Sequence, residues 1–132
     1  MESDKNQLSP DVLFFFDDHL SSLPIYEALS GVIFSRWPDA DLRVQKSQIT
    51  FSHRHVFACV SFLRVKPKAQ LPEGYLVLTL GLPYPLDSPR IAAKTEPYPG
   101  RWTTHIVLSR PDDLDDELLE WLTRAHDFAF SK

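Results

Sequence analysis

The sequence predicts an α+β fold in a single domain, with helices at both ends and a central antiparallel sheet. Apolar residues recur at helical spacing near the N-terminus and, more strongly, over residues 114–129. Between residues 42 and 109 apolar and polar residues instead alternate, which is the period of a strand. The 132 residues suit one domain, which we expect over residues 10–132 after a flexible N-terminus of residues 1–9.

Two helices are predicted before the sheet. Ser9 followed by Pro10 is a helix-start signal, because the serine hydroxyl can accept a free amide and proline fits the first turn. We expect this helix over residues 11–20. Its three consecutive phenylalanines, residues 14–16, cover a wider arc than one buried stripe, so at least one ring should meet a second surface. A second helix should begin near Pro24 and end at Trp37.

The sheet is expected to contain about five strands. The segments with strand character are residues 42–44, 49–51, 56–65, 75–82 and 101–109. Residues 83–100 hold five of the eleven prolines and are typical of a long loop. Within this segment, Pro99 and Gly100 suit the two central positions of a type II turn, since glycine accepts the positive φ of the second.

A C-terminal amphipathic helix packed on the sheet completes the predicted fold. Ser109 with Asp112 resembles a capping box, and the acidic residues that follow suit the positive end of a helix dipole. The apolar residues at spacings of three and four are Leu114, Leu118, Trp121, Leu122, Ala125, Phe128 and Ala129.

The composition indicates a soluble cytoplasmic protein. Its single cysteine, Cys59, excludes an internal disulfide, which a small secreted domain would usually have. The polar N-terminus lacks the features of a secretory signal, and the longest apolar run, residues 12–16, is too short to cross a bilayer. We therefore expect no membrane association.

The net charge of −4 conceals a segregation of charge along the chain. Residues 42–110 hold ten basic and three acidic side chains, whereas the segments on either side are acidic. One interpretation is that acidic helices compensate basic strand ends. The other is that basic side chains converge on an anionic ligand. The residues concerned are Arg43, Lys46, Arg90, Lys94 and Arg101.

Several blocks of the chain resemble a known bacterial family, catalogued as domain of unknown function 5655. The resemblance runs over about residues 10–130 and depends on the order and spacing of the blocks. It implies a small α+β domain and supplies no activity and no site residues. A remoter likeness is to YdhG-type domains and, in outline, to frataxin. The blocks are residues 23–29 (LPIYEAL), 46–51 (KSQITF), 81–83 (GLP), 87–91 (DSPRI), 97–105 (PYPGRWTTH) and 115–118 (DDEL).

The leading functional hypothesis is a binding module without catalysis, for an anionic small molecule or a nucleic acid. Alternation places Arg101 and His105 on one strand face, with Thr103 between them. Guanidinium groups with an imidazole suit a phosphate or carboxylate, and aromatic rings can stack on a base. The predicted ligand-binding residues are Lys46, Arg90, Arg101, His105, Tyr98 and Trp102.

Three alternatives stay open. The aromatic residues 14–16 and Trp37 would suit a protein partner or a homodimer. The acidic residues 112–120 would suit a frataxin-like domain that binds iron or another metal. Cys59 and His105 would suit an enzyme if they lie on neighbouring strands. The pair His53 and His55 lacks a third ligand, so we expect no metal site there, and no motif indicates a cofactor.

Overall fold

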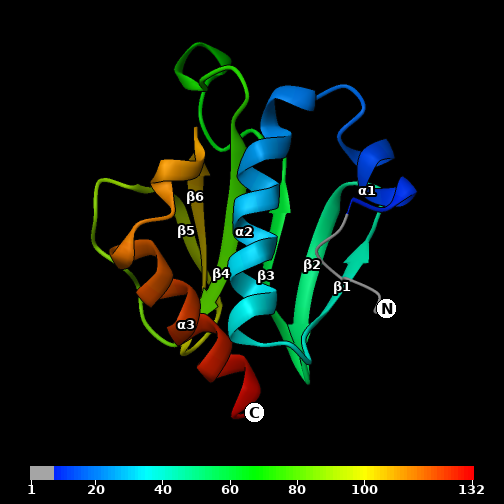
Figure 1. The fold of residues 1–132 in the computed structure, drawn as a ribbon. Helices are drawn as coiled ribbons and strands as arrows, with labels where there is room; N and C mark the ends of the chain where they lie inside the picture. The colour runs from blue at the N-terminus through cyan, green and yellow to red at the C-terminus, as the bar shows by residue number, and fades with distance from the viewer. Residues whose placement is uncertain (1–7) are drawn as a thin grey trace.

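The structure, a computed structural model, describes residues 8–132, so most of the predicted flexible N-terminus lies outside the described residues. Its centre is an antiparallel sheet in the order β1-β2-β3-β4-β6-β5 (Figure 1). The strands are β1 Asp41–Val44, β2 Gln48–His53, β3 His55–Ser61, β4 Leu76–Leu82, β5 Ile91–Tyr98 and β6 Arg101–Leu108. The helices are α1 Pro10–Phe15, α2 Leu23–Arg36 and α3 Asp116–Phe130, with short 3₁₀ turns at Leu20–Ser22, Lys68–Gln70 and Pro111–Asp113. The predicted α+β fold is confirmed.

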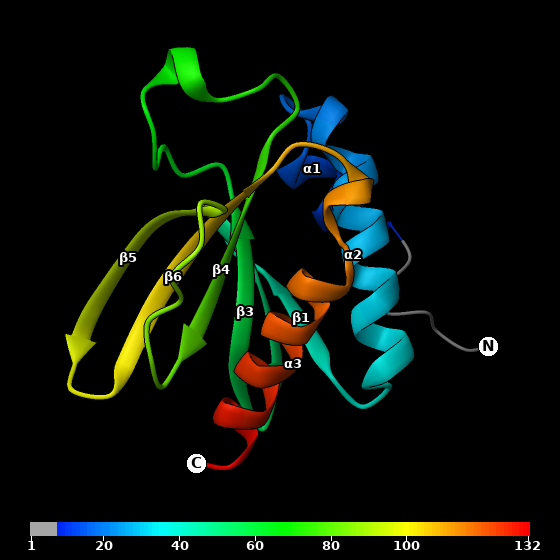
Figure 2. The same cartoon turned by 90° about the vertical axis from the view of Figure 1, so that its left-hand side faces the viewer.

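The two faces of the sheet have different surroundings. Helices α2 and α3 lie side by side against one face, which Figure 2 shows from the edge. This face includes the even-numbered leucines of β4, Leu76 to Leu82, and all four are fully buried, as their alternation predicts. The opposite face includes Thr79 of β4, with Cys59 and His105 as its register partners on β3 and β6. We call this second face the open face, because neither α2 nor α3 covers it.

Helix α1 divides its phenylalanines between the core and the surface. Ser9 accepts a hydrogen bond from the amide of Val12 at 3.3 Å, so the predicted start signal is confirmed. The helix ends at Phe15, earlier than expected, because Phe16 turns into the core and packs on Tyr26 with ring centroids 5.2 Å apart. Phe14, by contrast, is 82% exposed. The three rings therefore do not share one buried stripe, as their wide arc predicts.

The sheet has one strand more than expected, because β5 lies in the segment predicted as a loop. This strand forms an edge of the sheet, pairs only with β6 among the described strands, and is exposed over its second half. An exposed edge strand needs no buried apolar face, so its alternation is weak, and it tolerates Pro97, which a central strand would exclude. The turn that joins β5 to β6 is as predicted, since Gly100 has φ +75°.

The last helix begins later than predicted. The Ser109 amide and hydroxyl both donate to the Asp113 carboxylate, at 2.8 and 3.0 Å, so Asp113 takes the role expected of Asp112. The helix proper starts after Asp115, whose side chain accepts from the amide of Leu118. Its apolar stripe packs on β3 and β4, as expected. Within residues 8–132 no helix combines the length and apolar character needed to span a bilayer.

Candidate ligand-binding cavity

A cavity of about 660 Å³ lies over the open face of the sheet. Its floor comes from strands β2, β3, β4 and β6, and its walls from helix α1 with the residues after it, from the β1–β2 turn, and from the end of β3. It is therefore assembled from segments far apart in the sequence. The lining residues are Phe14, Phe15, Asp18, His19, Lys46, Ser47, Gln48, Cys59, Ser61, Phe62, Leu63, Thr79, Thr103 and His105.

The floor of the cavity contains a hydrogen-bonded row of polar side chains that crosses the sheet. The Cys59 thiol donates to Gln48 Oε1 at 3.7 Å, and the Thr79 hydroxyl shares a hydrogen bond of 2.8 Å with His105 Nδ1. The register explains the row, since Cys59 pairs with Thr79 and Thr79 pairs with His105. Side chains directly opposite on one sheet face lie close enough to interact.

The register also separates Cys59 from His105. Strand β4 lies between β3 and β6, so the two residues share a face but are two strand spacings, roughly 10 Å, apart. The condition for a catalytic pair, that the two residues lie on neighbouring strands, is therefore not met, and Thr79 lies between them. Burial raises the pKa of the Cys59 thiol and lowers the pKa of His105. At neutral pH the thiol therefore stays protonated and the imidazole uncharged.

Aromatic rings form one wall of the cavity. Phe15 stacks on Phe62 with centroids 5.3 Å apart, and His19 stacks on Phe62 at 3.8 Å and an interplanar angle of 16°. Phe14 also lines the cavity, and its ring is exposed. An exposed ring beside a cavity is unfavourable in water, and a ligand that covers it would gain the free energy of its burial.

Lys46 and Ser47 lie at the mouth of the cavity, on the turn between β1 and β2. No ion pair or hydrogen bond of the Lys46 ammonium group is found within the part of the chain that the structure describes. Asp18 lines the same cavity from the segment after α1. Among the described residues that line the cavity, Lys46 is the only lysine or arginine.

Of the six predicted ligand-binding residues, Lys46 and His105 line this cavity together. Trp102 pairs with the buried Leu82 and so belongs to the face that α2 and α3 cover. Tyr98 and Arg101 are register partners beside the β5–β6 turn, outside the cavity, and both are exposed. Thr103 and His105 share a strand face, as alternation predicts, and both line the cavity. Arg101 does not line it.

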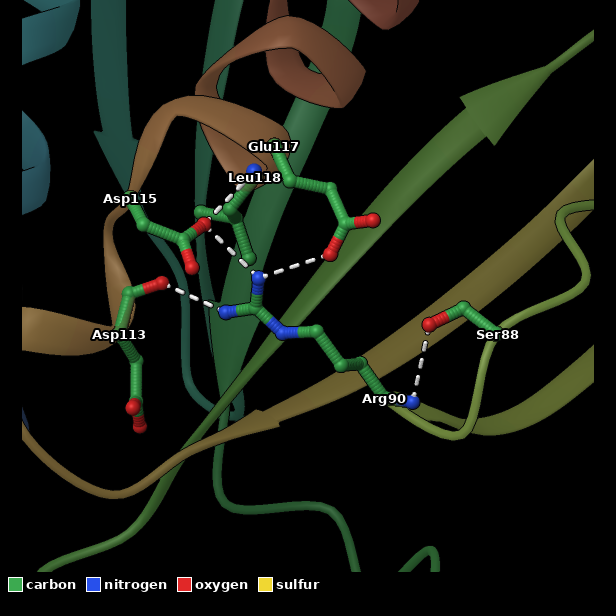
Figure 3. A network of polar contacts seen from close by, with 6 residues as sticks. All are labelled: Ser88, Arg90, Asp113, Asp115, Glu117 and Leu118. Atoms are coloured by element: carbon green, nitrogen blue, oxygen red, sulfur yellow. Dashed lines mark hydrogen bonds and ion pairs between the residues drawn. The ribbon is translucent and has the colours of Figure 1, made fainter.

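Arg90 is engaged elsewhere, in the network that Figure 3 shows. Its guanidinium donates to Asp115 at 2.8 Å, to Glu117 at 3.2 Å and to the carbonyl oxygen of Asp113 at 2.7 Å. It also lies 5.7 Å from the ring centroid of Trp121, in a cation–π contact. These bonds tie the start of β5 to the start of α3, so here a basic strand end is compensated by an acidic helix.

Two further candidate residues, Lys94 and His53, also have protein partners. Lys94 donates to the carbonyl oxygen of Leu86 at 2.8 Å. His53 does not face a metal site with His55 but shares a hydrogen bond of 2.8 Å with His126, which stacks on Trp37. Within residues 8–132 no three side chains of the metal-binding types lie close enough together to hold an ion.

Sequence reasoning missed most of the cavity walls. The run of phenylalanines indicated a second surface but not that Phe15 would stack on Phe62 or that Phe14 would line the same cavity. Gln48 and Thr79 carried a usable signal, because both occupy polar positions in alternating strands. What the sequence lacked was the pairing order, which sets which polar positions of different strands become neighbours.

Comparison with known proteins gives one match. The family model described as a domain of unknown function, DUF5655, matches residues 14–129. No curated protein and no solved structure matches the chain.

Proposed function

The chain belongs to the family of the domain of unknown function DUF5655, which brings no activity with it, and we propose that it binds a mononucleotide or a similar small anion carrying a flat ring. The ligand occupies the cavity on the open face. The proposal depends on one observation, that the cavity combines an aromatic wall, an uncharged polar floor and a single cation at its mouth.

The size of the cavity suits a small organic molecule. Ligand sites typically measure about 300–1,000 Å³ and combine apolar walls with a few placed polar groups. The volume of about 660 Å³ falls in this range. The exposed Phe14 ring supports a flat ligand group, because a base can stack on an aromatic side chain regardless of its identity.

The polar groups define where the rest of the ligand binds. The Lys46 ammonium at the mouth attracts a phosphate or carboxylate, and the neighbouring Ser47 hydroxyl can donate a further hydrogen bond. The Thr79 and Thr103 hydroxyls and the uncharged His105 imidazole supply donors and acceptors for a sugar. Of the six predicted ligand-binding residues, the proposed site therefore retains two, Lys46 and His105.

We assign binding without catalysis. A cysteine nucleophile needs a thiolate and a base within hydrogen-bond reach. Burial favours the neutral thiol of Cys59, and Thr79 separates it from His105. A nucleotide-binding role also fits the cytoplasmic location expected from the single cysteine.

Thermal unfolding with adenosine and uridine monophosphates tests this proposal. A ligand at 100 times its Kd stabilises the folded state by about 2.7 kcal/mol, which a melting curve resolves easily. We expect Lys46→Met and Phe14→Ala to reduce the shift. The matched controls are Lys68→Met and Leu13→Ala, exposed residues outside the cavity, which should preserve it. If neither nucleotide shifts the wild-type Tm, or if the controls lose as much as the cavity variants, the proposal is wrong.

A second candidate function is association with another protein or a second copy of this chain. The observation that favours it is a set of exposed apolar side chains in one segment, Leu13, Phe14 and Leu20. Sedimentation equilibrium of the wild type and Leu20→Ala distinguishes the two proposals, because Leu20 does not line the cavity. A dimer that Leu20→Ala dissociates would favour association.

A further inference from the structure

A second, smaller hollow lies next to the cavity on the open face. This hollow measures about 180 Å³ and shares three lining residues with the cavity, Cys59, Thr79 and Thr103. Beyond them it extends to Val56 at the start of β3 and to Gly81 near the end of β4. The two spaces are therefore adjacent along β3 and β4, and we call them together the groove, with Lys46 at one end and Gly81 at the other.

Building on the proposed function, we infer that the ligand is longer than one nucleotide and that the base of a second nucleotide lies over Gly81. The ligand class is then a single-stranded oligonucleotide. The first nucleotide occupies the cavity beside Phe14, and the second occupies the hollow.

Gly81 itself is the first part of the argument. A glycine inside a strand weakens it, and it often marks a place where a ligand approaches the backbone closely. The backbone does not require glycine here, since Gly81 is not among the residues with positive φ. Packing does not require it either, because an added Cβ would meet no protein atom within 4 Å. Glycine keeps this part of the groove open.

The chemistry of the hollow is the second part. Among residues 8–132 no charged side chain lines it, and Val56 is 55% exposed beside it, so it suits an uncharged, largely apolar group such as a base and not a phosphate. The hydroxyl of Thr103 lines both spaces and can donate to an oxygen of a linking phosphate.

The positions of the two base sites favour a single strand over a duplex. Phe14 lines only the larger cavity, and Gly81 lines only the smaller hollow. Neighbouring bases of a duplex are stacked and rise by only about 3.4 Å for each nucleotide. Bases held at Phe14 and at Gly81 are in separate spaces and therefore not stacked on each other, as a single strand permits.

The test compares thymidine 5′-monophosphate with the 5′-phosphorylated dinucleotide of thymidine by calorimetry on the full chain. A stacked or buried base is worth about 1–3 kcal/mol, so we expect the dinucleotide to bind the wild type at least about fivefold more tightly. Gly81→Phe fills the hollow and should abolish this difference while the mononucleotide still binds. Thr95→Phe is the matched control, because Thr95 pairs with Thr103 on the same face, is exposed and lines neither space.

The outcomes separate the two proposals. If the wild type does not bind the mononucleotide, the proposed function itself is wrong. If it binds both ligands equally, or if Gly81→Phe retains the preference for the dinucleotide, only the second base site is wrong. Retained mononucleotide binding shows that Gly81→Phe is folded, and Gly81→Val serves as the smaller substitution should the phenylalanine variant unfold. A duplex that binds as tightly as the dinucleotide would also overturn the inference.

Discussion

Replacing Arg90 by methionine should destabilise the protein without weakening ligand binding. Methionine retains an apolar side chain of similar length but removes the guanidinium group and therefore every bond in Figure 3 that this group makes. The arginine side chain is only 26% exposed, whereas its partners Asp115 and Glu117 are 53% and 55% exposed. The loss should therefore come mainly from the bond to the Asp113 carbonyl and less from the two carboxylates.

The magnitude follows from this distribution. A hydrogen bond from a charged donor contributes about 1.5–3 kcal/mol, whereas ion pairs with exposed partners contribute little because water screens them. We therefore expect the free energy of unfolding to fall by about 2 kcal/mol. For a domain of this size the Tm should fall by roughly 6–8 °C. Urea unfolding followed by tryptophan fluorescence measures the change.

Arg124→Met provides the control. Arg124 bonds to Glu120 and to the Tyr84 hydroxyl, but all three groups are exposed, so we expect the urea midpoint to stay near the wild-type value. The reasoning would be refuted if Arg90→Met left stability unchanged and abolished nucleotide binding. In that case Arg90 would be a ligand-binding residue, as the sequence predicted.

Three further predictions concern single residues. Within residues 8–132 the fully buried Thr104 hydroxyl has no hydrogen-bond partner, so Thr104→Val should raise the free energy of unfolding by about 1 kcal/mol in urea titrations, and a loss would show that the hydroxyl is satisfied. Burial lowers the pKa of His105, so below about pH 6.5 the unfolded chain binds a proton that the folded chain excludes. Wild-type stability should then fall more than that of His105→Gln as the pH drops from 7.5 to 5.5, and parallel urea midpoints would contradict this. Gly100 has φ +75°, so Gly100→Ala should cost about 1 kcal/mol, whereas Gly81→Ala should cost none, and equal losses in thermal melts would refute the distinction.

The sequence predicted most of the fold because local periodicity reports burial on one side of an element. The alternating leucines of β4 and the apolar stripe of α3 both bury one face, and both were recognised from their spacing. Strand β5 was not predicted, because little of it is buried. It lies at the edge of the sheet, and half of it is exposed, so burial imposed no alternation on it.

The candidate site was only partly predictable. Alternation along β6 placed Thr103 and His105 on one face, and the turn position of Lys46 made it accessible. The sequence alone could not exclude Arg90 or Arg101 from the ligand-binding site. It does not show whether a basic side chain forms an ion pair within the protein, because that depends on which residues lie next to it in the fold. The acidic start of α3 then proved to be the partner of Arg90.

The sequence by itself thus determined the class of fold, the strand that carries His105 and the separation of basic from acidic segments. Only the tertiary structure decided that β4 lies between β3 and β6, that Thr79 therefore separates Cys59 from His105, and that Phe15 stacks on Phe62 beside the cavity. The physical reason is that periodicity records how each segment meets solvent and core. Which segments then become neighbours depends on pairing and packing between residues far apart in the chain.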